Sequence, residues 1–396
     1  MPGDVDPLAV TEVPEKQPAG ENESVNWEHQ YLSQIPFKVL RGHSDAVSCC
    51  HFCFNDNRIL TSSHDKTIKL WDINYDASLI TYEGGHSAPI VECALISNNK
   101  RFVTASWDKT VKCWDFETQK ILWTAVCDGL VTCCDVSPDG KYITCGSDME
   151  NSAYILDAGS GKIIKKLKDH HKSTVTACRF DPDSQRVASV SSDKTIKLWD
   201  LVAQRTTLNI KSGHLSVISD CSFSKNGFYL CTASWDKKLL LWDIKTGMFR
   251  SCGAVALDHG HTGSISSCKF SHDSSFLVSG AYDKTLTLWD TEARCKKIVL
   301  KGHEDWVMDT AITTDKKWIA SSSKDMTLRL WNTENLHYIP SVIESQKTVG
   351  LKIVMCKECG KPFSINQMED LEIISRCVFC RFNDPLRNAI PSPPTF

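Results

Sequence analysis

Histidine, hydroxyl, aspartate and tryptophan residues recur together in this chain of 396 residues, always at the same spacing. Six histidines are each followed by a serine or threonine after 18 positions, an aspartate after 22 and a tryptophan after 28. Serine, histidine and aspartate form the triads of hydrolases, but a triad is defined by geometry and role rather than by residue types. Six triads would make six enzymes of one chain, so the repetition favours a structural role.

Either of two positions could supply the hydroxyl group of each set. The residue four before the aspartate is serine or threonine in every copy, whereas Ala281 interrupts the series two before it. We therefore assign the first of these positions. The sets are His43, Thr61, Asp65 and Trp71; His86, Thr104, Asp108 and Trp114; His171, Ser189, Asp193 and Trp199; His214, Thr232, Asp236 and Trp242; His261, Ser279, Asp283 and Trp289; and His303, Ser321, Asp325 and Trp331.

A second group that could bind a ligand lies near the C-terminus. Cys356 and Cys359 are separated by two residues, as are Cys377 and Cys380, with seventeen residues between the pairs. Two such pairs are typical of a zinc ion held by four thiolates. A segment of ~35 residues needs a metal or disulfide to fold, and a disulfide does not suit a reducing compartment. We predict a zinc-ribbon-like module at 351–385 that holds one structural Zn²⁺ and leaves no site for a catalytic water.

Repeated structural units must position the six polar sets. Each unit alternates apolar and polar residues in short runs broken by Asp-Lys or Asp-Gly turns, as β-strands do. A period near 43 residues is visible, and periods of ~40–45 residues are typical of β-propeller blades. The repeated segments are TSSHDKTIKLWD (61–72), TASWDKTVKCWD (104–115), SVSSDKTIKLWD (189–200), TASWDKKLLLWD (232–243), SGAYDKTLTLWD (279–290) and SSSKDMTLRLWN (321–332).

With a histidine ahead of each segment, usually after glycine, the pattern resembles the WD-repeat family over residues 36–333. The resemblance implies an all-β, seven-bladed β-propeller whose blades each have four antiparallel strands. It also implies that in each blade the indole N–H reaches the hydroxyl, the hydroxyl reaches the histidine and the histidine reaches the aspartate. Residues 36–43, PFKVLRGH, are implied to complete the last blade and so close the ring.

One of the seven units departs from the pattern. Between 127 and 157, Cys127 or Asp128 stands in place of the histidine and Leu156 in place of the tryptophan. The apolar alternation persists, so we count a blade held by packing. Its second half, SAYILDAGSGKIIKKL, resembles the repeat of quinoprotein propellers, a short similarity that we attribute to blade packing rather than to a quinone cofactor.

Composition excludes several classes of protein. The net charge of −3 and the balance of charges over 351–390 make nucleic acid an unlikely partner. We expect no signal peptide and no membrane span, since no apolar segment approaches ~20 residues. Nineteen cysteines without a secretory signal indicate a cytoplasmic or nuclear location. We expect residues 1–35 to be a disordered acidic tail, 334–350 a linker and 386–396 a disordered tail.

A binding face is predicted from the residues that precede each turn aspartate. The aspartate points inward to its histidine, so the residue before it should project from one rim of the ring. Exposed aromatic residues gathered on one face are the usual anchors of interfaces, although each ring could merely cover its neighbouring blade. The predicted partner-binding residues of this kind are His64, Trp107, Trp235, Tyr282 and Lys324. The resemblance implies that the chain reaches the same rim three positions after each histidine, which adds Trp306, with Met308 two positions further on.

These observations favour a non-enzymatic scaffold, a monomeric propeller that binds partner proteins within a larger complex. Two alternatives remain. Trp242-Asp243-Ile244-Lys245 is similar to the element by which some WD-repeat proteins dock a cullin-type ubiquitin ligase as substrate receptors. The quinoprotein-like segments leave a quinone-dependent enzyme as the less favoured alternative.

Overall fold

The computed structural model describes residues 35–75, 77–96, 99–257 and 260–334, together with two strands further along the chain. The propeller predicted at 36–333 lies within these ranges. The expectations for an acidic tail, a linker, a C-terminal tail and the four zinc ligands fall wholly or almost wholly outside the described residues.

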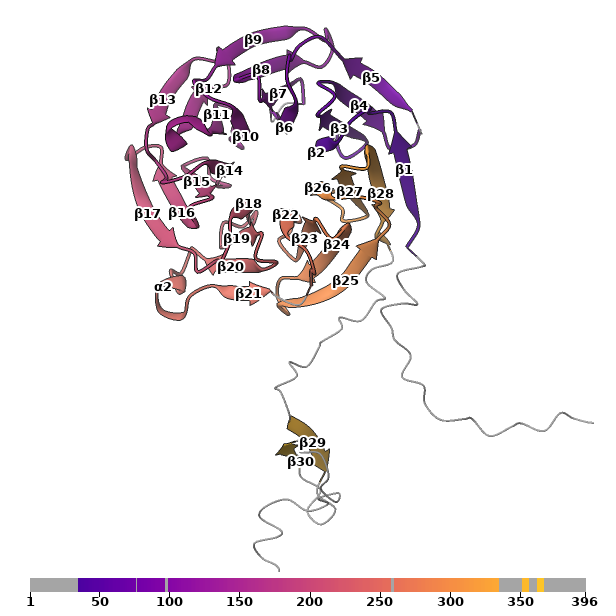
Figure 1. The fold of residues 1–396 in the computed structure, drawn as a ribbon, viewed down its shortest axis with the longest axis vertical. Coiled ribbons are helices and arrows are strands. Elements are labelled where there is room, and N and C mark those ends of the chain that lie inside the picture. The colour runs from indigo at the N-terminus through magenta and orange to yellow at the C-terminus, as the bar shows by residue number, and fades with distance from the viewer. Residues whose placement is uncertain are drawn as a thin grey trace, which may run out of the picture.

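Seven four-stranded antiparallel sheets are arranged as a ring of blades around a central channel (Figure 1). The predicted seven-bladed propeller is therefore confirmed. From the centre outward the strands are, in blade one, β2 (Val47–Cys53), β3 (Arg58–Ser63), β4 (Ile68–Asp72) and β5 (Ser78–Tyr82); in blade two, β6 (Ile90–Leu95), β7 (Arg101–Ser106), β8 (Thr110–Asp115) and β9 (Ile121–Val126); in blade three, β10 (Val131–Val136), β11 (Tyr142–Ser147), β12 (Ala153–Asp157) and β13 (Ile163–Leu167).

The remaining blades follow the same order. They are, in blade four, β14 (Val175–Phe180), β15 (Arg186–Ser191), β16 (Thr195–Asp200) and β17 (Arg205–Lys211); in blade five, β18 (Ile218–Phe223), β19 (Tyr229–Ser234), β20 (Leu239–Asp243) and β21 (Val255–Leu257); in blade six, β22 (Ile265–Phe270), β23 (Phe276–Ala281), β24 (Thr285–Asp290) and β25 (Cys295–Lys301); in blade seven, β26 (Val307–Ile312), β27 (Trp318–Ser323), β28 (Thr327–Asn332) and β1 (Phe37–Arg41).

Burial explains the sequence of each strand. The second strand of a blade is covered by the neighbouring blades on both faces, so β15 reads RVASVS and only its first residue is partly exposed. The fourth strand faces solvent, so β17 reads RTTLNIK and alternates exposed with half-buried residues. Each innermost strand also contains a β-bulge, as between Val47 and Cys49 in β2, which increases its local twist.

The last blade is closed by the first strand of the chain. In Figure 1, β1 lies along the outer edge of blade seven, and Phe37 pairs with Trp331 while Arg41 pairs with Thr327. The predicted role of PFKVL is confirmed. Leu40 is 1% exposed, and Ile35 packs beside the core of blades six and seven. Closure covers the edge that β28 would otherwise leave unpaired.

Smaller elements are also present among the described residues. A 3₁₀ turn (η1, Met149–Asn151) links β11 to β12, and a single helical turn (α2, Phe249–Cys252) lies between β20 and β21. Beyond the propeller, β29 (Leu351–Met355) pairs antiparallel with β30 (Pro362–Asn366), with Met355 opposite Pro362.

Deleting residues 1–41 should lower the melting temperature by on the order of 10 °C, because it removes β1 and uncovers the core beneath Leu40. Deleting 1–33, which leaves β1 and Ile35 in place, should change it by less than about 2 °C. Differential scanning calorimetry of both truncations against the full chain would test this. Equal effects would show that ring closure contributes little to stability.

Candidate functional site at the blade network and the propeller rim

The four repeated side chains meet at one end of six blades. In each, the histidine Nδ1 lies 2.7–3.2 Å from the aspartate Oδ2, and its Nε2 lies 2.7–3.0 Å from the hydroxyl oxygen. In five blades the tryptophan Nε1 donates to the same hydroxyl over 2.8–3.1 Å. The aspartate Oδ2 also accepts the backbone N–H that follows the histidine, at 2.7–3.1 Å. This blade network joins three separate segments of each blade.

In the five blades whose indole reaches the hydroxyl, donor and acceptor chemistry fixes the direction of every proton in the blade network. An indole N–H can only donate and an ionised carboxylate can only accept. The hydroxyl oxygen therefore accepts from tryptophan and donates its own proton to Nε2, while Nδ1–H donates to the aspartate. A neutral histidine completes this series of hydrogen bonds, and no group in the series needs an additional proton.

The same geometry would suit a hydrolase triad, but accessibility excludes that role for these six sets. The hydroxyl side chains belong to residues that are at most 1% exposed. In blade one, Thr61 is also occupied by the Trp71 indole. A nucleophile must reach the substrate atom that it attacks, and none of these oxygens can.

Burial and hydrogen bonding set the charge states of the blade network. Burial lowers the pKa of His86, His214 and His303, although the partner aspartate of each opposes the shift. Burial alone would raise the pKa of Asp325, but hydrogen bonds from His303 and Thr327 lower it well below its ordinary value. The network thus holds a neutral imidazole against an ionised carboxylate.

Blade four departs from the implied blade network at Trp199. In blades one, two, six and seven the histidine follows a glycine, and a Cβ added there would lie 2.1–2.9 Å from the tryptophan ring. His170 occupies this position in blade four, so the indole cannot pack in the same place. The His170 Nε2 lies 3.0 Å from the Ser189 Oγ, which His171 also contacts, and Trp199 is half-buried with its ring edge-on to His170. The histidine pair at 170–171 was the sequence signal for this exchange.

Blade three replaces the polar set with sulfur and apolar packing. The strand register places Leu156 opposite Ile143, as the tryptophans lie in other blades, and places Cys145 at the hydroxyl position. The Cys145 thiol hydrogen-bonds that of Cys127, which therefore takes the place of the histidine. Asp128 lies outside this core, where the Tyr154 hydroxyl and Lys166 bind its carboxylate.

The residues before the turn aspartates share one backbone contact that places them on a single face. In every blade such a residue donates its N–H to the carbonyl of the residue just before the innermost strand, as Trp107 does to Pro89 at 3.1 Å. In blade seven the donor is Lys324 and the acceptor is Trp306, at 2.8 Å. Trp306 therefore reaches the same rim.

The aromatic side chains of this rim contact one another across blades. Trp235 lies 6.5 Å from Tyr282, Tyr282 stacks on Trp306 at 4.7 Å, and the Lys324 ammonium lies 4.2 Å from the Trp306 ring centre. Their exposed fractions are 44% for Trp235 and 42% for Trp306. We call Trp235, Tyr282, Trp306 and Lys324, which span blades five to seven, the aromatic rim.

The other predicted partner-binding residues lie apart from the aromatic rim. Trp107 is 40% exposed, and its ring centre lies 5.4 Å from that of His64 in the preceding blade. Met308 is half-buried within β26, at the position where Ser48 and Ser219 donate their hydroxyls to a carbonyl of the next blade. Met308 thus lies at a seam between blades, while Trp107 and His64 form a second exposed pair.

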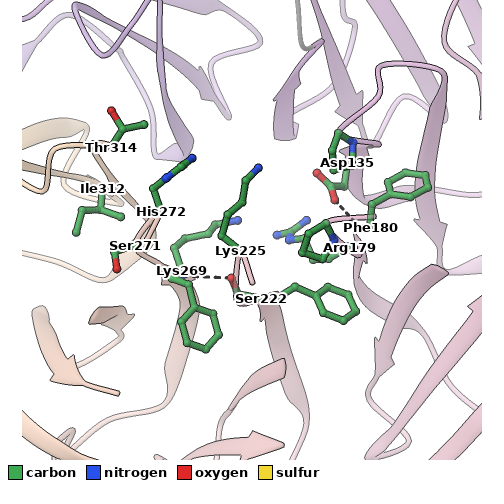
Figure 2. Close-up of a pocket in the computed structure, with 14 residues that line it drawn as sticks. Asp135, Arg179, Phe180, Ser222, Lys225, Lys269, Ser271, His272, Ile312 and Thr314 are labelled. Carbon is green, nitrogen blue, oxygen red and sulfur yellow. Dashed lines mark hydrogen bonds between the residues drawn. The ribbon is translucent and has the colours of Figure 1, made fainter. Parts of the chain in front are cut away.

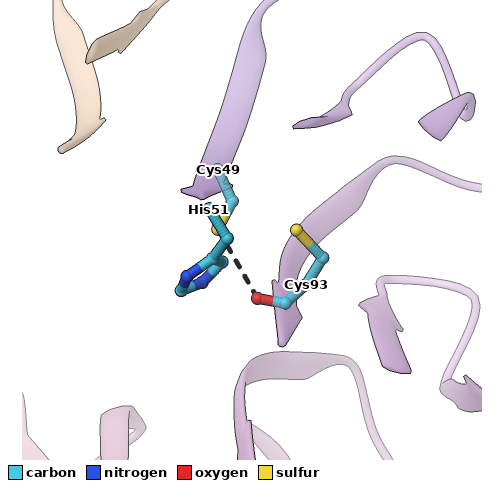
Figure 3. Close-up of side chains that lie close together, drawn as sticks. All are labelled: Cys49, His51 and Cys93. Carbon is cyan, nitrogen blue, oxygen red and sulfur yellow. Dashed lines mark hydrogen bonds between the residues drawn. The ribbon is translucent and has the colours of Figure 1, made fainter. Parts of the chain in front are cut away.

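Side chains of the innermost strands include one cluster with metal-ligating residue types. The ligand atoms of Cys49, His51 and Cys93 lie within 4.8 Å of one another (Figure 3). The Cys49 thiol, however, donates to the Cys93 carbonyl at 3.7 Å. Burial, with the charges of Lys269 and Arg179, lowers the pKa of His51 to about 3. The two neighbouring cations would repel a metal ion, so this cluster is better explained as packing of the channel wall.

Sequence reasoning missed an ion pair that spans the channel wall. The Arg179 guanidinium lies 2.7 Å from Glu92 of blade two and 2.8 Å from Asp220 of blade five. Glu92 also accepts the Cys134 N–H, and Asp220 accepts the Cys268 N–H. The available signal was the presence of charged residues in strands that are otherwise apolar or cysteine-rich.

Comparison with known protein families gives two matches. A WD domain, G-beta repeat matches residues 34–72, 254–290 and 294–332, and the second β-propeller of echinoderm microtubule-associated protein matches residues 92–256. These matches cover the regular blades and the divergent third blade.

Relatives of known name agree with the family matches. Human WD repeat-containing protein 88 is 54% identical over 387 residues, which cover 96% of this chain and 82% of that protein. The bovine serine-threonine kinase receptor-associated protein is 24% identical over 178 residues, or 43% of this chain and 47% of the relative. Periodic tryptophan protein 2 of Saccharomyces cerevisiae is 37% identical over 174 residues, 19% of its length. None of these names supports the quinoprotein resemblance. Within the described residues, no helix has the length and apolar character needed to cross a membrane.

Stability should fall as the pH is lowered from 7.5 to 5.5. Burial lowers the pKa of His170 to about 3 and that of His171 to about 4, and it also lowers the pKa of His86, His214 and His303. The unfolded chain binds protons on these histidines below pH ~6.5, and the folded chain does not. Their contribution is therefore complete above that pH and is lost as the pH falls towards the folded pKa values.

Melting temperatures measured across this pH range would test the expectation. His170→Gly removes one buried histidine and introduces the glycine of the regular blades, so its profile should be less steep than that of the wild type. Leu122→Ala, at an exposed position that does not titrate and lies outside the blade network, should leave the slope unchanged. A wild-type profile without a slope would contradict the charge states assigned here.

Proposed function

This chain belongs to the WD-repeat family of β-propeller proteins, and we propose that it is a non-enzymatic scaffold whose aromatic rim binds a partner protein. The observation that carries the proposal is the row of Trp235, Tyr282 and Trp306, which ends in the Lys324 ammonium; Tyr282 stacks on Trp306 and contacts Trp235 in a tilted arrangement. Tryptophan, tyrosine and cationic side chains grouped at a surface are the composition of interface hot spots.

Rigid support for these side chains strengthens the proposal. Each rim residue precedes a turn aspartate or a bulged inner strand, and both are held by hydrogen bonds of the backbone and the blade network. Little conformational entropy is then lost when a partner binds, which favours affinity. The rings do contact neighbouring blades, but the two indoles remain more than two-fifths exposed and so retain apolar area that a partner can cover.

Replacing both indoles of the aromatic rim should abolish partner capture without unfolding the propeller. We expect Trp235→Ala with Trp306→Ala to reduce recovery of co-purified proteins at least tenfold, because each indole is a hot-spot side chain worth ~2 kcal/mol or more. Quantitative affinity purification from the native tissue would measure the loss, and calorimetry would monitor folding.

A matched control is available on the outer strand β9. Leu122→Ala with Val126→Ala also removes two exposed apolar side chains, but away from the rim, and should leave capture unchanged. If the tryptophan double variant unfolds, its rings are packing residues. If it remains folded and still captures partners, the binding face lies elsewhere.

We further propose that residues 351–385 hold one structural zinc ion through Cys356, Cys359, Cys377 and Cys380. The hairpin β29–β30 supports this proposal, because Met355 and Pro362 pair and only six residues connect them. Both Cys356 and Cys359 are in that connection, as in zinc sites whose first ligand pair lies at a hairpin turn. When bound, the ion would cross-link the two cysteine pairs and replace an apolar core that so short a segment lacks.

Protein purified under reducing conditions should contain about one zinc per chain by elemental analysis. Cys359→Ser should remove that zinc and increase protease sensitivity of the C-terminal segment alone, because the propeller does not depend on it. Cys252→Ser, at an exposed cysteine of the propeller, should retain the metal. Wild-type protein free of zinc would overturn the proposal.

The alternative of a cullin-ligase substrate receptor has weaker support. A 57-residue match to a probable E3 ubiquitin ligase complex SCF subunit of Penicillium rubens covers 8% of that protein. In the candidate docking element, Trp242 is buried and the Lys245 ammonium lies 3.9 Å from the Phe228 ring centre. A pull-down of the ligase adaptor distinguishes this function. For the location we propose the cytoplasm or nucleus, supported by described cysteines that are all free thiols.

A further inference from the structure

A hollow of about 340 Å³ opens at the end of the channel opposite the aromatic rim. Its walls are the last residues of the inner strands of blades three to seven and the loops that follow them, whereas the rim residues lie where those strands begin. Figure 2 shows side chains of Arg179, Lys225, Lys269 and His272 extending into this space from blades four, five and six. A volume of this size suits a small ligand.

We call this space the basic hollow, because its lining contains more positively than negatively charged groups. Arg179, Lys225, Lys269 and His272 can carry positive charge, and Asp135 is the single carboxylate among the fourteen lining residues. The Asp135 carboxylate accepts the Phe180 N–H at 2.8 Å; burial raises its pKa, and the charges of Arg179 and Lys269 oppose that shift.

Carboxylates deeper in the channel do not satisfy these cations fully. Glu92 and Asp220 bind one side of the Arg179 guanidinium, yet its Nε is buried and has no hydrogen-bond partner. A buried donor of this kind is costly when left unpaired. Asp309 accepts the Cys50 N–H of blade one. These acids hydrogen-bond the backbone of the next blade, and although burial alone would lower the pKa of Lys269, their charges raise it and keep its ammonium protonated.

The two lysines have donors available for a ligand. Within the described part of the chain, neither Lys225 nor Lys269 makes a hydrogen bond or an ion pair through its ammonium group. Lys269 lies within the channel and is half-buried, while Lys225 and His272 are exposed at its mouth. Cationic hydrogen-bond donors from blades four, five and six therefore surround the hollow, and none of them binds another of the residues that line it.

We propose that this basic hollow binds a phosphate group of a small phosphorylated ligand, with Lys269 and Lys225 as its charged partners and the positive charge of Arg179 in its wall. A phosphate carries up to two negative charges and accepts several hydrogen bonds from different directions, which matches donors that converge from separate blades. A single carboxylate, planar and singly charged, would leave part of this set unpaired. The site is independent of partner binding at the aromatic rim.

Isothermal titration of the full-length protein with inorganic pyrophosphate would test the proposal. Binding is expected at low ionic strength and should weaken as salt is added, because salt screens charges near the surface. Lys225→Ala and Lys269→Gln should each weaken binding about tenfold, the usual effect of losing one charge-assisted hydrogen bond. Lys301→Ala, which removes an exposed lysine of the outer strand β25, should have no effect.

Two further comparisons make the test decisive. Lys269 lies close to buried carboxylates, so if Lys269→Gln lowers the melting temperature, the exposed Lys225→Ala variant alone decides. A phosphoserine peptide titrated in parallel distinguishes a phosphorylated protein from a free phosphate as the source of the group. Absence of binding by both probes, or equal weakening by Lys301→Ala, would overturn the proposal.

Discussion

One hydroxyl oxygen in each regular blade supports much of the rest of the structure. It accepts the indole N–H of the third strand and donates to a histidine that in turn holds the turn aspartate. Three segments distant in sequence are thereby fixed at one end of the blade, and the residues beside them become a rigid surface. Each link depends on the next, because a buried donor or acceptor left unpaired costs ~1–3 kcal/mol.

The repeated features of this fold are predictable from the sequence, whereas those that occur once are not. A residue seen six times at one spacing is enough to assign the hydroxyl position from residue types. The blade count also needs the apolar alternation of the divergent third unit, and the closing strand is implied by the resemblance to the WD-repeat family. The role of His170 is not predicted from the sequence. In other blades a glycine stands at this position, and the sequence suggests that it is a turn residue rather than that its missing side chain leaves space for an indole. The Arg179 ion pairs are not predictable either, because three blades bring together residues 41 to 87 positions apart.

The propeller separates two kinds of surface by the direction of its inner strands. At their beginnings lie indole and phenol rings on tight turns, an arrangement suited to an apolar protein surface. At their ends lie cations that converge on one open hollow. Between these two faces, polar contacts such as that of the Glu92 carboxylate with the Cys134 N–H join each blade to its neighbour without any covalent link. Binding at one face could therefore proceed while the other is occupied.

The pairing of β1 with β28 has a consequence for synthesis of the protein. Roughly 290 residues separate the two strands, so β1 leaves the ribosome long before its partner exists. At ~5–20 residues per second the delay is about 15–60 seconds. During that time six blades can form in succession from local hairpins, while blade seven must wait for both ends of the domain. The nascent ring is therefore an open arc with two unpaired edges, and this interval is when a chaperone or a second nascent chain has access to it.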